Sequence, residues 1–231
     1  MKIVYEATRN YYKFLRATIQ SLLDHNDPEV IFVLAEDDEI EGLPEVCKVI
    51  NVSNQQWIKR TSPNFHTPFS YMVLIRVAYT EILDCDKVLQ LDVDTIVLDD
   101  LKPLWDVDLT GKWFGAVPEH LGTYKPYGKR YYNAGVCLFN LAQMRADNIT
   151  QTLINELNSH FYAYPEQDVF NKYGQANDKA VALDPRYNAS FCCGLPKNPA
   201  IFHYAGITNW WEEQLNPKWE YLAPYAPLIT E

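Results

Sequence analysis

The sequence predicts an α/β fold in which a mixed, mostly parallel central sheet is flanked by helices. One observation is that short apolar runs suited to buried strands alternate with segments whose apolar residues recur at helical spacing. Another is the opening strand–helix–strand order, which is typical of parallel sheets covered by helices. The length of 231 residues suits one large domain with a substantial core. We therefore expect residues 1–231 to form a single domain.

Composition narrows the class of protein. Hydrophobic residues make up 48% of the chain and charged residues 22%, as in globular proteins. The formal net charge of -10 argues against a nucleic-acid partner, because phosphate binding needs basic surface. The five cysteines are irregularly spaced and match neither a disulfide framework nor a zinc-binding pattern, and we expect the adjacent Cys192 and Cys193 to be reduced thiols. We see no signal peptide and no transmembrane segment, and expect a cytoplasmic protein, in which the three glycosylation-like triplets at Asn51, Asn148 and Asn188 are chance matches.

The first third of the chain supplies the opening strands and two helical patterns. Strands are expected at residues 2–5, 30–34 and 46–52, and helices at 11–23 and 69–83, with a polar and aromatic loop over 53–68 between them. No Gly-rich fingerprint follows the first strand, which excludes a dinucleotide-binding loop and a P-loop. Arg76, in the second helical pattern, is either a solvated surface residue or a ligand for a phosphate or carboxylate.

An apolar run from Val88 to Val97 carries two aspartates and is expected to be one strand. Side chains alternate along a strand, so Asp92 and Asp94 would share one face. Two neighbouring carboxylates at the end of a buried strand are unfavourable unless a cation lies between them. The alternative is a pair of solvated turn residues. The apolar flanks favour a divalent metal.

The second half continues the alternation. Strands are expected at 113–118, after Gly135 up to Asn140, at 180–183 and at 200–206. Helices are expected within 141–161 and from 164 onward. The segment 119–130 is expected to be a loop, and the aromatic tail at 210–226 to pack over the site or the sheet edge. Ala134 and Gly135, just before a strand, form either a tight turn or a place where a ligand approaches the backbone closely. Glu166 and Asp168 follow Pro165 as expected of a helix start.

His203 lies in the last expected strand. A single histidine in such a place is usually a satisfied core residue. It becomes a metal-ligand candidate if the fold brings it to Asp92 and Asp94.

The order of these motifs resembles glycosyltransferase family 8, the group of glycogenin and bacterial galactosyltransferases. The motifs are Arg76 in a helix, Leu91 to Thr95, Asn133 to Val136, Glu166 to Asn171 and His203 to Gly206, and they span nearly the whole chain. The resemblance implies a GT-A fold, a UDP-sugar donor, a glycan or glycoconjugate acceptor, and retention of configuration at the anomeric carbon.

The resemblance also assigns roles to residues. It implies a Mn²⁺ ion, with Mg²⁺ as the alternative, on Asp92, Asp94 and His203; imidazole favours Mn²⁺, the softer ion. It places Gln167 beneath the anomeric carbon, with the acids Glu166 and Asp168 beside it as catalytic candidates. The remaining donor-binding positions that it implies are Ala7, Thr8, Arg76, Val93, Asn133, Ala134 and Gly206, together with Asp92.

Two positions depart from the family pattern. An acid that usually follows the first strand and contacts uracil is replaced by the run from Ala7 to Asn10, which includes Arg9. A lysine that usually follows the late His-x-x-Gly is replaced by a region where Asn209 is nearest. Arg9 and Lys218 are the candidates to supply the missing positive charge.

Two other functions fit parts of the sequence. Asp92-Val93-Asp94-Thr95 also matches the Asp-x-Asp-x-Thr of haloacid-dehalogenase phosphohydrolases, with Asp92 as nucleophile and Asp94 as acid or base. That motif normally lies on the first strand, whereas several strands precede it here. The loss of the lysine leaves a third possibility, a non-catalytic sugar-nucleotide binder.

Overall fold

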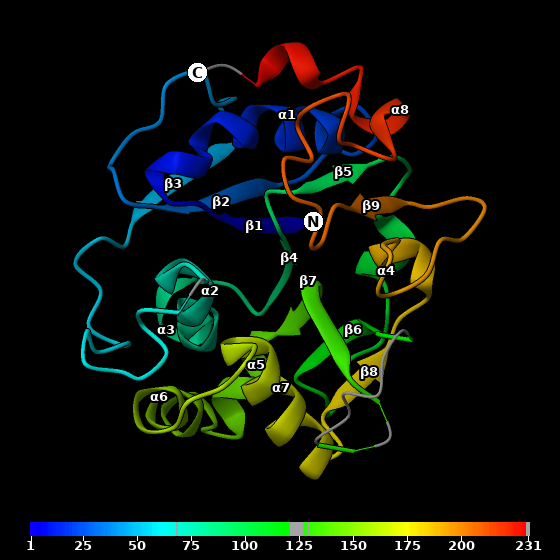
Figure 1. The fold of residues 1–231 in the computed structure, drawn as a ribbon. Helices are drawn as coiled ribbons and strands as arrows, with labels where there is room; N and C mark the ends of the chain where they lie inside the picture. The colour runs from blue at the N-terminus through cyan, green and yellow to red at the C-terminus, as the bar shows by residue number, and fades with distance from the viewer. Residues whose placement is uncertain (68, 121–126, 129, 230–231) are drawn as a thin grey trace.

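A computed structural model of the chain describes residues 1–67, 69–120, 127–128 and 130–229 (Figure 1). Its strands are β1 (Lys2–Glu6), β2 (Val30–Ala35), β3 (Cys47–Asn51), β4 (Lys87–Leu91), β5 (Thr95–Val97), β6 (Phe114–Pro118), β7 (Tyr132–Asn140), β8 (Ala180–Ala182) and β9 (Ile201–His203). Its α-helices are α1 (Tyr12–Leu23), α2 (Tyr71–Leu74), α3 (Tyr79–Ile82), α4 (Lys102–Trp105), α5 (Leu141–Ala146), α6 (Thr150–Ser159), α7 (Pro165–Ala176) and α8 (Trp219–Leu222). Short 3-10 helices are η1 (Arg9–Tyr11), η2 (Ile75–Ala78), η3 (Pro185–Asn188) and η4 (Ala226–Leu228).

Seven strands form the main sheet in the order β3-β2-β1-β4-β7-β6-β8. The pairs β3–β2, β2–β1, β1–β4 and β6–β8 are parallel, whereas β7 runs antiparallel to both β4 and β6. The predicted α/β class with a mixed, mostly parallel sheet is confirmed.

The two faces of the sheet bury two separate sets of side chains. On β1, Ile3 and Tyr5 pack with Leu15 and Ile19 of α1, while Val4 packs with the 71–82 helical segment on the other face. This alternation follows from the two-residue period of a strand, and both faces are apolar because helices cover both. Figure 1 shows α1 on one side of the sheet and α2, α3, α5, α6 and α7 on the other.

The helix expected over 69–83 is interrupted. The chain forms α2, then the 3-10 turn η2, then α3. All four residues of η2 are buried, including Arg76. The β-branched residues in this segment favour α-helix only weakly, which agrees with the tighter 3-10 turn in its middle.

The continuous strand expected over 88–97 is wrong. β4 ends at Leu91, and Asp92 to Asp94 form a turn in which the amide and hydroxyl of Thr95 donate to the carbonyl of Asp92, at 3.2 and 2.7 Å. β5 then leaves the main sheet and pairs antiparallel with β9. The alternation argument therefore does not apply to the aspartates; the turn itself sets their directions.

Two further expectations are corrected or refined. Residues 133–135 do not precede a strand, because β7 begins at Tyr132. The aromatic tail packs on α1 and on the small β5–β9 sheet, where Trp210 stacks on Tyr204 at a centroid distance of 5.0 Å. Among the residues described, no helix is both long and apolar enough to cross a bilayer.

Candidate active site

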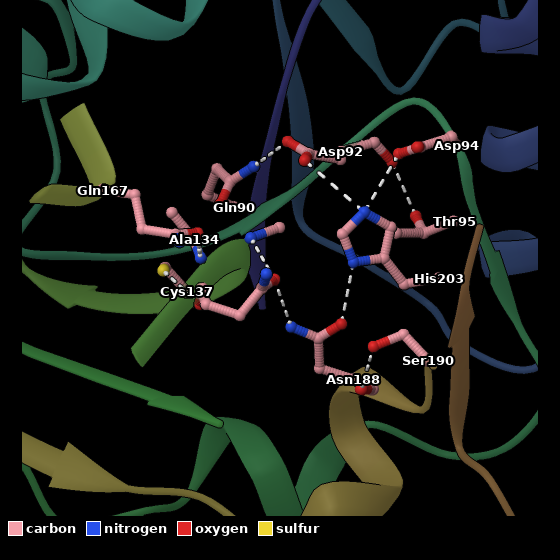
Figure 2. Close-up of polar contacts among 12 residues, drawn as sticks. Gln90, Asp92, Asp94, Thr95, Ala134, Cys137, Gln167, Asn188, Ser190 and His203 are labelled. Carbon is pink, nitrogen blue, oxygen red and sulfur yellow. Dashed lines mark hydrogen bonds and ion pairs between the residues drawn. The ribbon is translucent and has the colours of Figure 1, made fainter. Parts of the chain in front are cut away.

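A cluster of two carboxylates and one imidazole lies where β4, β5 and β9 meet. One ligand atom each from Asp92, Asp94 and His203 can be chosen so that all lie within 4.8 Å of one another. His203 Nε2 is 3.2 Å from Asp94 Oδ1 and 3.6 Å from Asp92 Oδ2 (Figure 2). The register Thr95↔His203 in the β5–β9 pair brings the late histidine beside the turn. The structure therefore assembles the three residues that the sequence predicted as metal ligands.

The electrostatics of this cluster favour a cation. Burial raises the pKa of Asp92 despite its contact with Arg76. Burial also opposes the charge on Asp94, but the neighbouring imidazole outweighs it and lowers the pKa of that carboxyl. For His203, burial lowers the pKa, yet the two aspartates outweigh burial and raise it to about 9. The imidazole and the two carboxylates thus favour one another's charged forms, as expected of a site that attracts positive charge.

Arg76 forms a second group of charged residues next to this cluster. Of the two interpretations of Arg76 from the sequence, the structure agrees with the carboxylate-binding arginine and not with the solvated surface residue. Its side chain is only 3% exposed. The guanidinium contacts both oxygens of Glu6 at 3.1 and 3.2 Å, and it also contacts Asp92. It donates to the carbonyl of Ala134 at 3.0 Å and lies 3.5 Å from Glu166. One arginine therefore ties β1, the metal-site turn, β7 and α7 together.

The carboxylates around Arg76 outnumber it. Burial raises the pKa of Glu6 to about 8 and that of Glu166 to about 7, in both cases against the attraction of the guanidinium. Asp92 is the third acid of this group. Because the same group extends through Asp92 to Asp94, a divalent cation beside the aspartates would favour the ionised forms of these buried acids.

The start of α7 presents Gln167 to the backbone of β7. Gln167 Oε1 accepts the amide proton of Ala134 at 2.8 Å, and Nε2 donates to Glu119 at 3.3 Å. Asp168 is fully buried, and its oxygens accept from the hydroxyl of Tyr131 at 2.7 Å and the amide of Tyr164 at 3.0 Å. Asp168 therefore fastens the start of the helix, while Gln167 faces the strand.

Behind His203 lies a set of amide side chains. Asn188 is fully buried, and its Oδ1 lies 2.8 Å from His203 Nδ1. Its Nδ2 donates to Asn133 Oδ1 at 2.8 Å, and Asn133 Nδ2 donates to Glu119 at 2.9 Å. The predicted donor residue Asn133 is thus joined to the predicted metal ligand.

The remaining predicted positions lie on the segments that follow β1, β4 and β9. Ala7 directly follows Glu6 and is 2% exposed, whereas Thr8 is half-buried. Val93 lies in the aspartate turn, and Gly206 is an exposed left-handed residue after β9 with φ +74°. Among the described residues, no hydrogen bond links Ala7, Thr8 or Gly206 to Asp94 or His203, whereas Val93 is joined to both aspartates by peptide bonds.

The departures from the family pattern have structural consequences of their own. Arg9 is exposed and held by Asp37 through contacts of 2.6 and 2.8 Å. Lys218 pairs with Glu220 at 3.3 Å, and Asn209 adopts a left-handed conformation with φ 55°. Both candidate cations already have acidic partners.

Sequence reasoning missed four residues that build the site: Glu6, Gln90, Glu119 and Asn188. Glu6 had a signal, since it is an acid at the end of an otherwise apolar run. Gln90 had a weaker one, a polar residue inside a buried strand; its Nε2 donates to Asp92 at 2.9 Å. Asn188 stands out in the sequence only because it begins a glycosylation-like triplet. Its side chain is fully buried, which agrees with the expectation that the triplet occurs by chance.

The comparisons with known proteins agree with this geometry. A search of curated proteins finds GlyF of Streptococcus pneumoniae, a glycosyltransferase 28% identical over 90% of this chain. This chain spans 56% of the length of GlyF. General stress protein A of Bacillus subtilis is 25% identical over 97% of this chain and 91% of its own length.

Solved structures show the same fold. An active-site mutant of LgtC matches with a TM-score of 0.78 and 25% identity over 99% of this chain and 95% of its own. The galactosyltransferase LgtC in complex with donor and acceptor sugar analogues matches with a TM-score of 0.77 and 24% identity, over 100% of this chain and 97% of its own. The fold is therefore GT-A, as predicted. The family model of glycosyl transferase family 8 matches residues 2–214, and the chain belongs to that family.

Proposed function

We propose that this protein is a retaining, metal-dependent glycosyltransferase with residues 1–231 as one GT-A domain. It moves a hexose from a nucleoside diphosphate sugar, UDP-glucose or UDP-galactose, to a hydroxyl of a glycan or glycoconjugate. The observation that carries the proposal is the convergence of Asp92, Asp94 and His203 next to Arg76, in a chain of family 8. Family membership leaves the phosphohydrolase alternative without support.

The three candidate metal ligands, Asp92, Asp94 and His203, suit a divalent cation. Two carboxylates and an imidazole, close together and rich in negative charge, suit Mn²⁺ better than Mg²⁺. When bound, the metal neutralises the charge that develops on the departing diphosphate. Other side chains of the protein hold the metal-binding residues in place: Arg76 and Gln90 both donate hydrogen bonds to Asp92.

We assign the sugar-side roles to α7 and β7. Gln167 has its amide oriented by Ala134 and Glu119, which would fix it beneath the anomeric carbon of the donor. An amide is a poor nucleophile, so we favour attack of the acceptor hydroxyl on the face from which the phosphate leaves. Glu166 lies against Arg76, and Asp168 holds the start of the helix in place.

The nucleotide would lie along the ends of β1 and β4. We assign Ala7 and Thr8 to the base and ribose side, Val93 and Gly206 to the ribose and diphosphate, and Asn133 with Ala134 to the sugar. LgtC, which has the same fold, was solved in complex with a donor and an acceptor sugar analogue, and this supports a place for both substrates in the fold. With Arg9 in the place of the usual acid and bound to Asp37, the base contact must use other groups of this chain.

Proton NMR of the reaction tests the function. The protein is incubated with UDP-glucose or UDP-galactose, with Mn²⁺ or with a chelator, and with p-nitrophenyl phosphate as the competing substrate. We expect slow Mn²⁺-dependent release of free sugar that appears first as the α-anomer. Hydrolysis of the phosphate ester would contradict the proposal, and binding of UDP-sugar without any turnover would show a non-catalytic binder.

A further inference from the structure

An uninterrupted line of hydrogen bonds runs from His203, on the side away from the aspartates, to Glu119. Its links are His203 Nδ1 to Asn188 Oδ1, Asn188 Nδ2 to Asn133 Oδ1, and Asn133 Nδ2 to Glu119 Oε1, at 2.8, 2.8 and 2.9 Å. Figure 2 shows Asn188 on one side of the imidazole and the two aspartates on the other. We call these four residues the amide relay.

At the Asn133 end of the relay, two partners can act only as a donor or only as an acceptor, and they fix the orientation of the side-chain amide. The backbone amide of Gly135 can only donate, and it donates to Asn133 Oδ1 at 3.0 Å. An ionised Glu119 carboxylate can only accept, so the other half of the Asn133 side chain must be its NH₂ group. These two contacts set the orientation of the Asn133 amide.

The remaining links follow in sequence. Because Asn133 Oδ1 is an acceptor, the Asn188 atom 2.8 Å away must be its NH₂ group. The oxygen of Asn188 then faces His203, and only a protonated Nδ1 makes a hydrogen bond to it. With the Nδ1 proton donated to Asn188, Nε2 is the nitrogen that can offer a lone pair to a cation, and it lies 3.2 Å from Asp94.

We propose that Asn188 is a positioning residue that holds neutral His203 in its Nδ1–H form and directs the Nε2 lone pair at the cation site, with Asn133 and Glu119 fixing the orientation of Asn188. The value of this arrangement to the cation rests on the proposed function. A neutral amide suits the position, because it accepts from the imidazole without adding a further negative charge beside Asp92 and Asp94. Metal-bound histidines commonly have such a partner on their other nitrogen.

The relay also joins the metal side to the sugar side. Glu119 Oε1 accepts from both Asn133 and Gln167, at 2.9 and 3.3 Å. The residue that we place beneath the anomeric carbon and the residue that orients the histidine therefore share one anchor. Any change at Glu119 is expected to disturb both sides together.

Nitrogen-15 NMR of histidine-labelled protein tests the hydrogen bond between His203 and Asn188 directly. The ring N–H signals of His203 are assigned by their absence in His203→Gln. We expect an Nδ1–H signal that exchanges slowly with water in the unaltered protein, because that proton is donated to the buried oxygen of Asn188. Asn188→Asp keeps an acceptor and should keep this signal, whereas Asn188→Ala should lose it, even though both variants lose the bond to Asn133 and some thermal stability. A rapidly exchanging Nδ1–H in the unaltered protein, or an unchanged signal in Asn188→Ala, would overturn the proposal.

Mn²⁺ binding, followed by the electron paramagnetic resonance signal of the free ion, separates this proposal from the function. We expect Asn188→Ala to weaken Mn²⁺ binding about 10–100-fold, the usual effect of removing an outer partner of a ligand. Asn64→Ala is the matched control, since Asn64 is also buried and hydrogen-bonded, to Leu157 and His160, but lies outside the site. Equal affinities in Asn188→Ala and the unaltered protein would refute the role of the relay. If the unaltered protein bound no Mn²⁺, the metal site would fail, while the NMR result would still decide whether Asn188 accepts from Nδ1 of His203.

Discussion

Replacing Gly135 by alanine is the sharpest steric test of how the site is built. A Cβ atom added to Gly135 would lie 1.9 Å from His203 Cε1, 2.5 Å from Nδ1 and 2.8 Å from Nε2. Carbon atoms in contact prefer about 3.5–4.0 Å, so the ring or the strand would have to move by roughly 1.5–2 Å. The backbone of Gly135 is not left-handed, so the clash alone sets the effect.

The imidazole has little room to escape. It is held by Asn188 on one side and by the pairing of β9 with β5 in its backbone. Metal sites tolerate ligand displacements of only about 0.2 Å. We therefore expect Gly135→Ala to weaken Mn²⁺ binding by about 100-fold or more, beyond the upper end of an outer-partner effect.

Stability should fall as well. Overpacking a well-filled interior costs about 1–3 kcal/mol, which for a chain of this size corresponds to a drop in Tm of about 2–12 °C. The assay is thermal unfolding without metal, together with Mn²⁺ titration. Gly115→Ala is the matched control on β6, because the atom nearest to its Cβ is the tip of Leu183 at 3.1 Å, which can move aside.

A double variant identifies the cause. In a protein that already carries His203→Ala, adding Gly135→Ala should cost little further stability, since the clashing ring is gone, and it should not restore Mn²⁺ binding. If Gly135→Ala alone kept both the Tm and the Mn²⁺ affinity of the unaltered protein, the packing of His203 against β7 would be wrong.

Three further predictions concern charge. Arg76→Met should destabilise the protein by about 3–5 kcal/mol in chemical denaturation, because it leaves buried carboxylates uncompensated; an effect below about 1 kcal/mol would contradict the buried cluster. The pKa of Glu6 is raised to about 8 by burial, so stability should decline as the pH rises from about 4.5 through 8, and Glu6→Gln should flatten this decline. Glu156 has its pKa lowered to about 2, because hydrogen bonds from Lys172 and two tyrosines outweigh partial burial, so its contribution is present above about pH 4.5 and lost as the pH falls through 2. Glu156→Gln should lower Tm at pH 7 and change it little near pH 2, and an equal loss at both would contradict the ion pair.

Much of the fold could be predicted because it depends on local periodicity. The parallel strands and the helices α1, α6 and α7 have apolar patterns that match their burial on both sides of the sheet. The split of residues 88–97 could not be seen in this way. All residues from Thr95 to Val97 are buried, as they would be in one long strand, and only the partner β9, a hundred residues later, draws β5 out of the main sheet.

The site was predictable where it rests on charged residues in apolar surroundings. Asp92, Asp94 and His203 gave such a signal, and the structure brings them together. Asn188 gave none, because a neutral amide in a turn looks like any loop residue. Its role depends on a contact between residues 188 and 203 and on Asn133 behind it, which only the three-dimensional arrangement provides.

Calorimetric titration with UDP tests the central claim, that Asp92, Asp94 and His203 bind a cation that in turn binds the nucleotide. The unaltered protein and Asp94→Ala are each titrated with Mn²⁺ and with a chelator present. We predict that UDP binds to the unaltered protein only with Mn²⁺ and that Asp94→Ala abolishes this binding. Equal UDP affinity with the chelator, or Mn²⁺-dependent affinity that survives in Asp94→Ala, would contradict the claim.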